Sequence, residues 1–246
     1  SCTGFIMPCF TTIQAALVNA TDGDTIHVYP GTYTEPIGVC NGNAAMFCIT
    51  KNITITGDPG GPQAGCGPNA PVIDGMGAYA IAFVLDSVSN VVIEGLEIEN
   101  FSNDPSLFTG GVGSAMSAWN ADTFNITIND NCMHDLGWNG VLVGSDDGST
   151  QAGWVVRKNV ISKFNQTGIE LTNTNDSLVL FNIITGPVMI TPWDIGDAGV
   201  AIEIATRDFG GVGVSAHGIN VIGNIINGPF AAGSRAGVNI LSRAYA

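Results

Sequence analysis

The sequence predicts an all-β protein, a solenoid of about seven short coils stacked on one another. Three observations lead to this fold class. Short segments of alternating aliphatic residues recur along the 246-residue chain, with polar corners between them. An asparagine returns at the same corner of several of these units. No stretch keeps apolar residues at i, i+3, i+4 and i+7 through the repeats, so helices do not connect the strands.

Residues 125–144 are the clearest copy of the unit. Short strands are expected at 126–128, 132–134 and 141–143, where aliphatic residues alternate with polar ones. Asn131 forms one corner between them, and the Trp138-Asn139-Gly140 segment forms the next. Three strands and their corners within about twenty residues make one coil, with no room for helices.

The same unit recurs before and after this copy. Strand pairs with the same pattern lie at 90–100 with 113–119, 154–162 with 167–171, 178–185 with 198–204, and 219–226 with 236–241. Aligning them puts Asn131, Asn159, Asn182 and Asn224 in one column, with Gly95 in that place on an earlier coil. We expect these amides to stack as a ladder, each bonding to the next coil. The alternative is four unrelated turn asparagines.

The chain begins with a short helix and then enters the first coil. Ile13, Ala16 and Leu17 share one helical face, and Thr11-Thr12 can cap it, so a helix is expected over roughly 12–20. A turn at 22–24 leads to a strand at 25–29, and Pro30 opens the next turn. Residues 58–71 are a loop by composition, and strands resume at 72–73 and 81–85.

Three segments carry a resemblance to a known family: TIQAAL at 12–17, DGDTIHVYPGTYTE at 22–35 and NITITG at 52–57. They resemble the N-terminal cap and coils of right-handed parallel β-helix proteins of the pectin-lyase-like superfamily. The resemblance implies a single domain over 1–246, with an N-terminal cap at 1–24 and coils at 25–246. It does not imply one activity, since the superfamily includes lyases, hydrolases, esterases, epimerases, phage tailspikes and non-catalytic surface proteins.

Charge and hydropathy exclude several classes of partner. The chain has 21 acidic and 7 basic side chains and a net charge of −14, which disfavours binding to nucleic acid. No run of eighteen apolar residues exists, so no membrane-spanning helix is expected. The chain starts at Ser1-Cys2 without a signal peptide, and we expect a segment that has already been processed.

Cysteines and glycosylation sequons indicate a secreted protein. The chain has six cysteines and no Cys-x-x-Cys pair, so disulfides are expected rather than zinc; they are Cys2, Cys9, Cys40, Cys48, Cys66 and Cys132. Local pairs Cys2–Cys9 and Cys40–Cys48 are plausible, although spacing does not fix the connectivity. N-linked glycans are expected at the sequons that begin at Asn19, Asn52, Asn100, Asn125, Asn165 and Asn175.

Candidate functional residues gather along the strands at 167–171 and 198–204. By alternation, Glu170 and Glu203 should face outward on neighbouring coils. Asp146-Asp147 follow the equivalent strand of the preceding coil, and Arg207 follows Glu203. Such carboxylates could hold Ca²⁺, or divide into acid and base against a glycosidic bond, and no other cofactor is expected. The alternative is an acidic surface with carboxylates everywhere.

One further pair of residues could act in acid–base catalysis. The signature motifs of the superfamily's known enzymes, by contrast, are absent. His134-Asp135 could be a base and its orienter, but His134 lies on a coil strand beside the asparagine column, where a structural histidine is the favoured interpretation. A polygalacturonase-like enzyme has an Asn-Thr-Asp element, then an Asp-Asp pair, then Gly-His-Gly. Here the Asp-Asp pair at 146–147 comes before the Asn-Thr-Asn-Asp segment at 173–176, and the Ala-His-Gly at 216–218 lacks the leading glycine. Pectate-lyase-like, pectinesterase-like and epimerase-like signatures are missing as well.

The main functional expectation is therefore an extracellular structural or surface glycoprotein, leaning against catalysis. Its last strand, at 236–241, has no covering segment behind it, so the rod is expected to stack end to end into filaments. The alternative is a carbohydrate-active enzyme, a polysaccharide lyase or glycoside hydrolase that uses the outward carboxylates. A carbohydrate-binding module without catalysis is the third interpretation.

Overall fold

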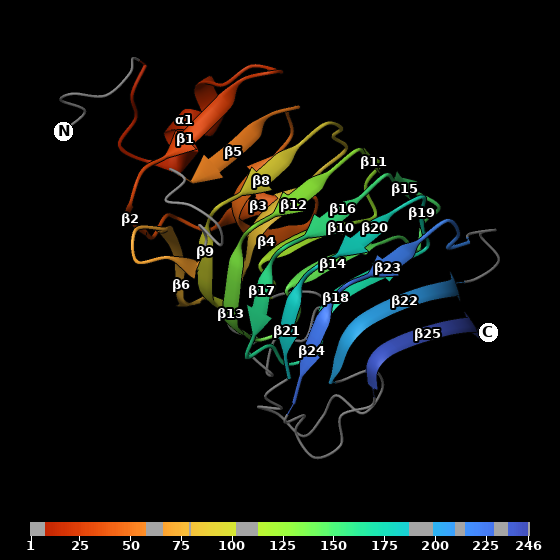
Figure 1. Ribbon diagram of the computed structural model, residues 1–246. Helices are drawn as coiled ribbons and strands as arrows, with labels where there is room; N and C mark the ends of the chain where they lie inside the picture. The colour runs from red at the N-terminus through yellow and green to blue at the C-terminus, as the bar shows by residue number, and fades with distance from the viewer. Residues whose placement is uncertain are drawn as a thin grey trace.

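The computed structural model describes residues 8–57, 66–78, 80–101, 113–186, 199–209, 215–228 and 236–245. Successive turns of the chain stack as coils, and each coil adds a strand to each of three sheets (Figure 1). The prediction of an all-β, right-handed parallel β-helix with a short N-terminal helix is confirmed. Among the described residues, no helix is long and apolar enough to cross a membrane.

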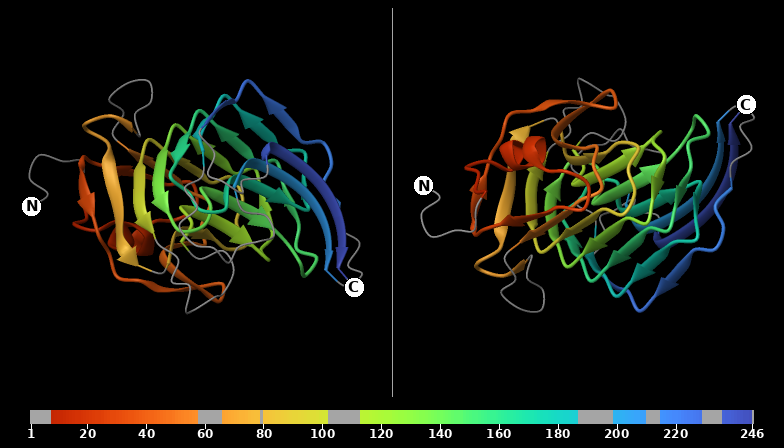
Figure 2. Two further views of the ribbon diagram at one scale, coloured as in Figure 1. Left: turned by 90° about the horizontal axis from the view of Figure 1, so that it is seen from below. Right: turned by 90° about the horizontal axis from the view of Figure 1, so that it is seen from above.

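The helix α1 (Ile13–Asn19) lies at the N-terminal end of the stack, as expected for 12–20 (Figure 2). It begins after Thr12, whose Oγ1 accepts a hydrogen bond from the backbone N–H of Ala15 at 3.1 Å. The Glu35 carboxylate accepts two more helix N–H groups, those of Ile13 at 2.6 Å and Gln14 at 2.8 Å. These bonds satisfy donors that the first helical turn leaves free.

The first sheet, sheet A, alternates clearly between core and solvent. Ile55, Ile93, Ile128, Val156 and Val179 are fully buried, while their neighbours in sequence point outward. In spatial order its seven strands are β1 (Thr25–Val28), β5 (Thr54–Gly57), β8 (Val92–Glu94), β12 (Thr127–Asn129), β16 (Val155–Arg157), β20 (Leu178–Leu180) and β23 (Asn220–Ile222). Burying one such aliphatic side chain is worth about 1.5–3 kcal/mol, which is why the coils stack.

Sheet B has the same coil order as sheet A and follows it after a two-residue corner in every coil except the second, where residues 58–70 lie between β5 and β6. Its seven strands are β2 (Gly31–Tyr33), β6 (Pro71–Ala78), β9 (Glu97–Phe101), β13 (Cys132–Leu136), β17 (Val160–Ser162), β21 (Ile183–Thr185) and β24 (Ile225–Asn227). The first corner residue takes a left-handed conformation, as at Gly95, where φ is +71°. The backbones of adjacent coils are so close here that a Cβ on Gly57 would overlap the carbonyl oxygen of Gly95.

The second residue of this corner is the asparagine of the aligned column. The Asn131 Nδ2 donates to Asn159 Oδ1 at 3.1 Å, and the Asn159 Nδ2 donates to Asn182 Oδ1 at 3.0 Å. The Asn182 Nδ2 donates to Asn224 Oδ1 at 2.9 Å. Each of these amides also donates to a backbone carbonyl of the preceding coil. The structure therefore places all four side chains in one continuous ladder inside the corner.

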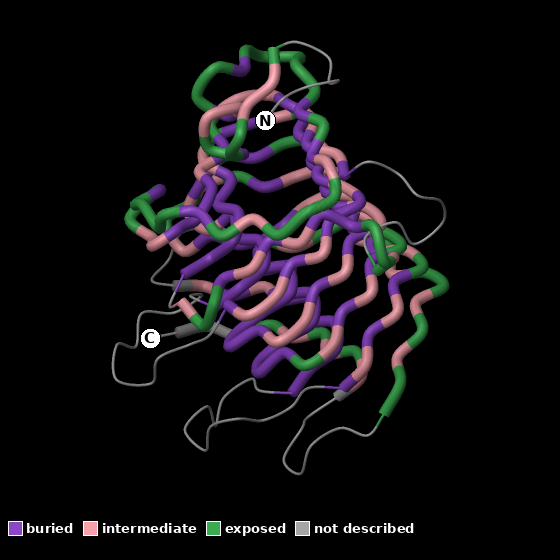
Figure 3. Tube along the Cα trace, turned by 90° about the vertical axis from the view of Figure 1, so that its left-hand side faces the viewer, coloured by how far each residue is buried: buried purple, intermediate pink, exposed green. Residues whose placement is uncertain are grey.

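Sheet C is buried on both faces over much of its length (Figure 3). Its strands in chain order are β3 (Gly38–Cys40), β4 (Asn43–Ile49), β7 (Ile81–Leu85), β10 (Met116–Trp119), β14 (Val141–Gly144), β18 (Thr167–Thr172), β22 (Val200–Phe209) and β25 (Ala236–Tyr245).

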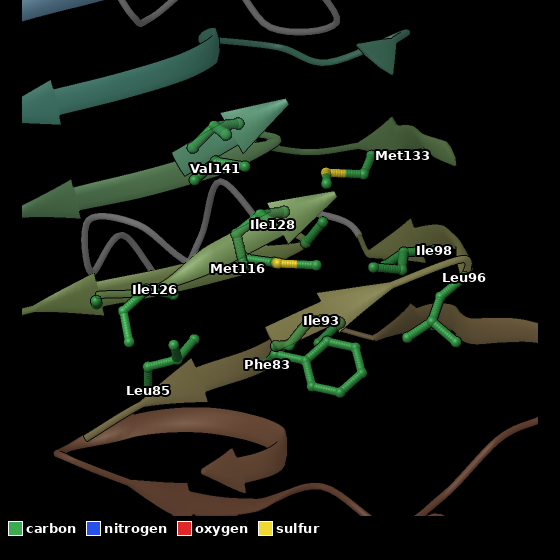
Figure 4. Close-up of a cluster of buried hydrophobic side chains, with 14 of the residues drawn as sticks. Phe83, Leu85, Ile93, Leu96, Ile98, Met116, Ile126, Ile128, Met133 and Val141 are labelled. Carbon is green, nitrogen blue, oxygen red and sulfur yellow. The ribbon is translucent and has the colours of Figure 1, made fainter. Parts of the chain in front are cut away.

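A small fourth sheet completes the coils, and all the sheets enclose one core. The fourth sheet contains β11 (Thr123–Phe124), β15 (Gln151–Ala152) and β19 (Thr174–Asn175). In the core, Phe83 and Met116 of sheet C meet Ile93 and Ile128 of sheet A and Met133 of sheet B (Figure 4). Since sheets A to C share one coil order, a residue's neighbours across the strands are those of the coils directly above and below.

Two disulfides lie in the described part of the chain. The expected Cys40–Cys48 disulfide is present and closes the β3–β4 hairpin. Cys66 pairs with Cys132 and ties the segment before β6 to the start of β13. The expected partner of Cys9, Cys2, lies outside the described residues, so that pairing stays a prediction.

Candidate active site

The outer face of sheet C holds a column of residues that lie side by side on successive strands. The column is Val84, Ser117, Leu142, Glu170, Glu203 and Asn239. Glu170 and Glu203 point outward because their neighbours in sequence, such as Ile169 and Ile202, fill the core. Glu170 is only 3% exposed and Glu203 is fully buried. Two carboxylates of adjacent coils thus meet away from bulk water.

Arg207 joins the two carboxylates. Its Nη2 contacts Oε1 of Glu203 closely and lies 3.4 Å from Oε1 of Glu170. Residues 203, 205 and 207 fall on the same face of β22 by alternation, and residue 205 is a small alanine. The long arginine side chain can therefore reach back along the strand to a carboxylate four residues earlier.

Neutral donors complete the contacts of both carboxylates. Thr172 Oγ1 donates to Oε1 of Glu170 at 3.0 Å, and Asn139 Nδ2 donates to its Oε2 at 3.1 Å. Asn239 Nδ2 donates to Oε2 of Glu203 at 3.1 Å. Each of the four carboxylate oxygens thus has a described partner, which fixes the position of both groups.

Two buried asparagines at the coil corners hold this arrangement in place. Asn139 accepts the backbone N–H of Thr167 at 3.0 Å through its Oδ1, so its Nδ2 is directed at Glu170. Asn173 accepts the backbone N–H of Arg207 at 2.9 Å and donates to its carbonyl at 3.0 Å. The backbone under Arg207 is therefore anchored to the preceding coil.

Burial gives Glu170 an unusual affinity for protons. The pKa of Glu170 is raised to about 7, chiefly by desolvation and in addition by the neighbouring Glu203 carboxylate. Arg207 and the hydrogen bonds from Thr172 and Asn139 lower the pKa of Glu170, but they do not offset the burial. Two carboxylates beside one guanidinium also leave an excess negative charge, which a proton on Glu170 removes. Near neutral pH the cluster can give up or take back this proton.

The structure brings together some of the residues expected from the sequence and separates others. Glu170, Glu203 and Arg207 form the cluster, whereas Asp146 and Asp147 lie past the end of β14, at a corner. Asp146 Oδ1 accepts from Asn120 Nδ2 at 2.5 Å, and Asp147 Oδ1 accepts from Ser149 Oγ at 2.6 Å. Asp146 thus connects its corner to Asn120 of the preceding coil, Asp147 stabilises its own turn, and neither has a described contact with the cluster.

Three members of the site were missed by the sequence reasoning. Thr172 and Asn239 occupy outward positions of aligned strands, two residues after Glu170 and beside Glu203. Alternation and coil alignment would have found them. Asn139 lies at a corner, just before β14, where the alternation of a strand does not apply. No sequence signal assigned that residue to the site.

The six sequons lie in different environments. Asn19 and Asn125 are exposed, and Asn52 is half-buried. Asn100 and Asn175 are half-buried as well, and Asn100 Nδ2 donates to Asp74 at 3.0 Å. Asn165 is only 6% exposed. Glycosylation at these sites stays a prediction.

Comparisons with known proteins give likenesses of fold only. No protein-family model matches the chain, and no curated protein matches it. One similar solved structure is a pectin methylesterase mutant in complex with a hexasaccharide, with 10% identity and a TM-score of 0.49, over 99% of this chain and 88% of that chain. Another is a pectin methylesterase from Yersinia enterocolitica, with 13% identity and a TM-score of 0.44, over 96% of this chain and 90% of that chain.

The main functional expectation from the sequence, a structural glycoprotein rod that stacks into filaments, is corrected. The solved structures named above are pectin methylesterases rather than structural filaments. The cluster on sheet C agrees with the correction, because burying two carboxylates and an arginine is a weak way to stabilise a rod.

Proposed function

We propose that this protein is a carbohydrate-active enzyme that hydrolyses carboxylic esters of a polysaccharide. The observation that carries the proposal is the buried pair Glu170 and Glu203, which share Arg207 and retain a proton near neutral pH. A buried carboxyl group whose pKa lies near neutral pH is typical of acid–base catalysis.

The position of the two carboxylates favours an ester bond over a glycosidic bond. In a glycosidase the two carboxyl groups flank the sugar from opposite sides, because displacement at the anomeric carbon is in line. Here both glutamates extend from adjacent strands on the same face of sheet C and contact the same nitrogen of Arg207. A nucleophile and an acid on one side suit attack on a planar acyl carbon. The lyase or glycosidase expected from the sequence therefore gives way to an esterase.

The roles of the three side chains follow from their contacts. The Glu203 carboxylate attacks the carbonyl carbon of the ester, while Arg207 holds it in place. The bond to the alkoxy oxygen breaks, and the leaving alcohol takes the proton of Glu170. Glu170 then accepts a proton from water, which opens the mixed anhydride. This step releases the carboxylic acid and restores both glutamates.

Exposure and charge set the kind of substrate. Arg207 is 9% exposed and is the most accessible member of the cluster, so the ester approaches over its guanidinium. A net charge of −14 repels free polyuronate, whereas an esterified polymer is neutral. The product acid is then repelled from the protein. Two described disulfides suit a protein that works outside the cell.

A product assay on methyl- and acetyl-esterified polygalacturonan tests the reaction class. We expect release of methanol or acetate with no new reducing ends and no unsaturated sugars. New reducing ends would indicate a glycosidase, and unsaturated ends would indicate a lyase. If no product forms with any of these polymers or with a small acyl ester, the proposed function is wrong.

A further inference from the structure

A second cluster of charged side chains lies on the outer face of sheet B. Strands β9 and β13 lie side by side (Figure 1). Ile98 and Met133 are buried, so by alternation Glu97 and Glu99 of β9 and His134 of β13 point outward. Glu99 pairs in register with His134, and Glu97 pairs with Cys132. One ligand atom from each of the three side chains lies within 4.8 Å of the other two. All three are half-buried, so an ion from solvent can reach them.

The spacing of these atoms fits one shared metal ion. His134 Nε2 lies 2.9 Å from Oε1 of Glu97 and 3.6 Å from Oε2 of Glu99. Ligand atoms around a tetrahedral zinc ion, each about 2.1 Å from the metal, are roughly 3.4 Å apart. Small rotations of the two carboxylates would bring all three atoms to that spacing.

The other ring nitrogen of His134 is held as it is in metal sites. His134 Nδ1 lies 2.7 Å from the Asp135 carboxylate, and Lys163 Nζ holds the same oxygen at 3.1 Å. Histidines that bind metals usually donate their second N–H to a carboxylate, which fixes the ring and directs the free nitrogen at the ion. Here that arrangement directs Nε2 at Glu97 and Glu99.

Charge and rigidity support the same conclusion. The carboxylates of Glu97, Glu99 and Asp135 lie against His134, Asp135 also contacts Lys163, and Asp74 lies close enough to Glu99 to raise its pKa. A divalent ion would offset this excess of negative charge. The Cys66–Cys132 disulfide fixes the start of β13 beside Glu97. The three ligands therefore extend from two adjoining strands rather than from a loop.

We propose that Glu97, Glu99 and His134 bind a divalent transition-metal ion such as Zn²⁺, with water at the remaining position. An imidazole nitrogen beside two carboxylates suits zinc, whereas Ca²⁺ and Mg²⁺ prefer ligand sets made only of oxygen. The ion would link β9 to β13 and so cross-link two coils. This site is on sheet B and does not depend on the esterase proposed for sheet C.

The test is calorimetric titration of the metal-stripped, full-length chain with Zn²⁺, with Co²⁺ as a spectroscopic probe. We expect one equivalent of Zn²⁺ to bind and to raise the Tm, and bound Co²⁺ to show visible d–d absorption. His134→Gln, Glu97→Gln and Glu99→Gln should each weaken binding at least tenfold. Asp135→Asn should weaken Zn²⁺ binding about 10–100-fold, because Asp135 orients His134 and does not itself bind the metal.

Two matched variants control for weak binding to an acidic protein. His217→Gln removes a histidine that lies 3.7 Å from the Asp176 carboxylate, and Glu94→Gln removes an outward carboxylate of sheet A. Both should bind Zn²⁺ as the wild type does. Far-UV circular dichroism and the metal-free Tm show whether each variant is folded. If a variant of a metal ligand does not fold, Asp135→Asn takes its place in the binding measurement. Equal affinities in wild type, His134→Gln and His217→Gln would overturn the site, as would tighter binding of Ca²⁺ than of Zn²⁺.

Discussion

Glu170 owes its chemistry to its surroundings rather than to its own type. It is a glutamate on a strand with a common sequence, Ile-Glu-Leu, yet burial raises its pKa to about 7. The groups that lower its pKa, Arg207, Thr172 and Asn139, are also the groups that fix its position. A carboxyl group in this state can donate a proton at neutral pH, which an exposed glutamate cannot do efficiently.

This shift should appear as a pH dependence of stability. Because the pKa of Glu170 is raised on folding, its contribution is fully present below about pH 4.5 and is lost as the pH rises toward 7. The loss is about 3 kcal/mol at most. We expect Glu170→Gln to remove this slope and to be more stable than the wild type at pH 8. Urea unfolding at a series of pH values measures the difference.

Thr172→Val is the matched control for this experiment. It removes one hydrogen bond to Glu170 but keeps the titrating carboxyl group, so the slope should remain. If the free energy of unfolding depends on pH in the same way for wild type and Glu170→Gln, Glu170 does not hold a proton in the folded state.

At the scale of a structural element, the corner between sheets A and B carries a continuous line of buried amides. Asn159 accepts from both the backbone N–H and the Nδ2 of Asn131, and it donates to Ile128 O and to Asn182. A leucine there would fill similar space and make none of these bonds. Buried polar groups of two neighbouring coils would lose their partners.

We therefore expect Asn159→Leu to lower the free energy of unfolding by about 1–3 kcal/mol. Asn224→Leu is the comparison, since Asn224 ends the described ladder and is partly exposed, so water can replace its bonds. Chemical denaturation of both variants gives the two values. A smaller loss at Asn159 than at Asn224 would contradict the ladder as a source of stability.

The coil pattern was readable from the sequence because its signals are local. Aliphatic alternation in residues 125–144 and the recurring asparagine gave the strands, the corners and the alignment of coils. The outward direction of Glu170 and Glu203 followed from the same alternation. Asp146 and Asp147 were wrongly grouped with them, because the chain turns away at a corner directly after β14. The contact between Arg207 and Glu203 depends on a side chain that runs back along its own strand, which no spacing rule gives.

At the scale of the whole molecule, the stack has two different ends. The N-terminal end carries α1, whose buried residues Ile13 and Leu17 cover the first coil (Figure 2). At the other end, β25 is the outermost strand of sheet C, and Ile240 is 79% exposed. The sequence was interpreted as that of a structural rod partly because it lacks the motifs of known β-helix enzymes. Those motifs describe particular enzymes, whereas the site here depends on which residues adjacent coils bring together.

The two described disulfides should contribute unequally to stability. Cys66–Cys132 joins residues 66 apart in sequence, and Cys40–Cys48 joins residues 8 apart. Loop-closure entropy then gives about 4 kcal/mol for the first and about 2–3 kcal/mol for the second. Replacing each pair by serines and measuring urea unfolding without reductant compares them. A larger loss from the Cys40–Cys48 pair would contradict this entropic account.

The most direct test of the central claim compares ester hydrolysis by the wild type, Glu203→Gln and Glu94→Gln. All three are measured on the same methyl-esterified polygalacturonan, by methanol released per enzyme, after circular dichroism shows that each is folded. If Glu203 is the nucleophile, Glu203→Gln should lose at least about 100-fold in kcat. Glu94→Gln, which removes an outward glutamate from sheet A, should keep the wild-type rate. A Glu203→Gln variant that is as active as the wild type would contradict the assignment of this cluster as the active site.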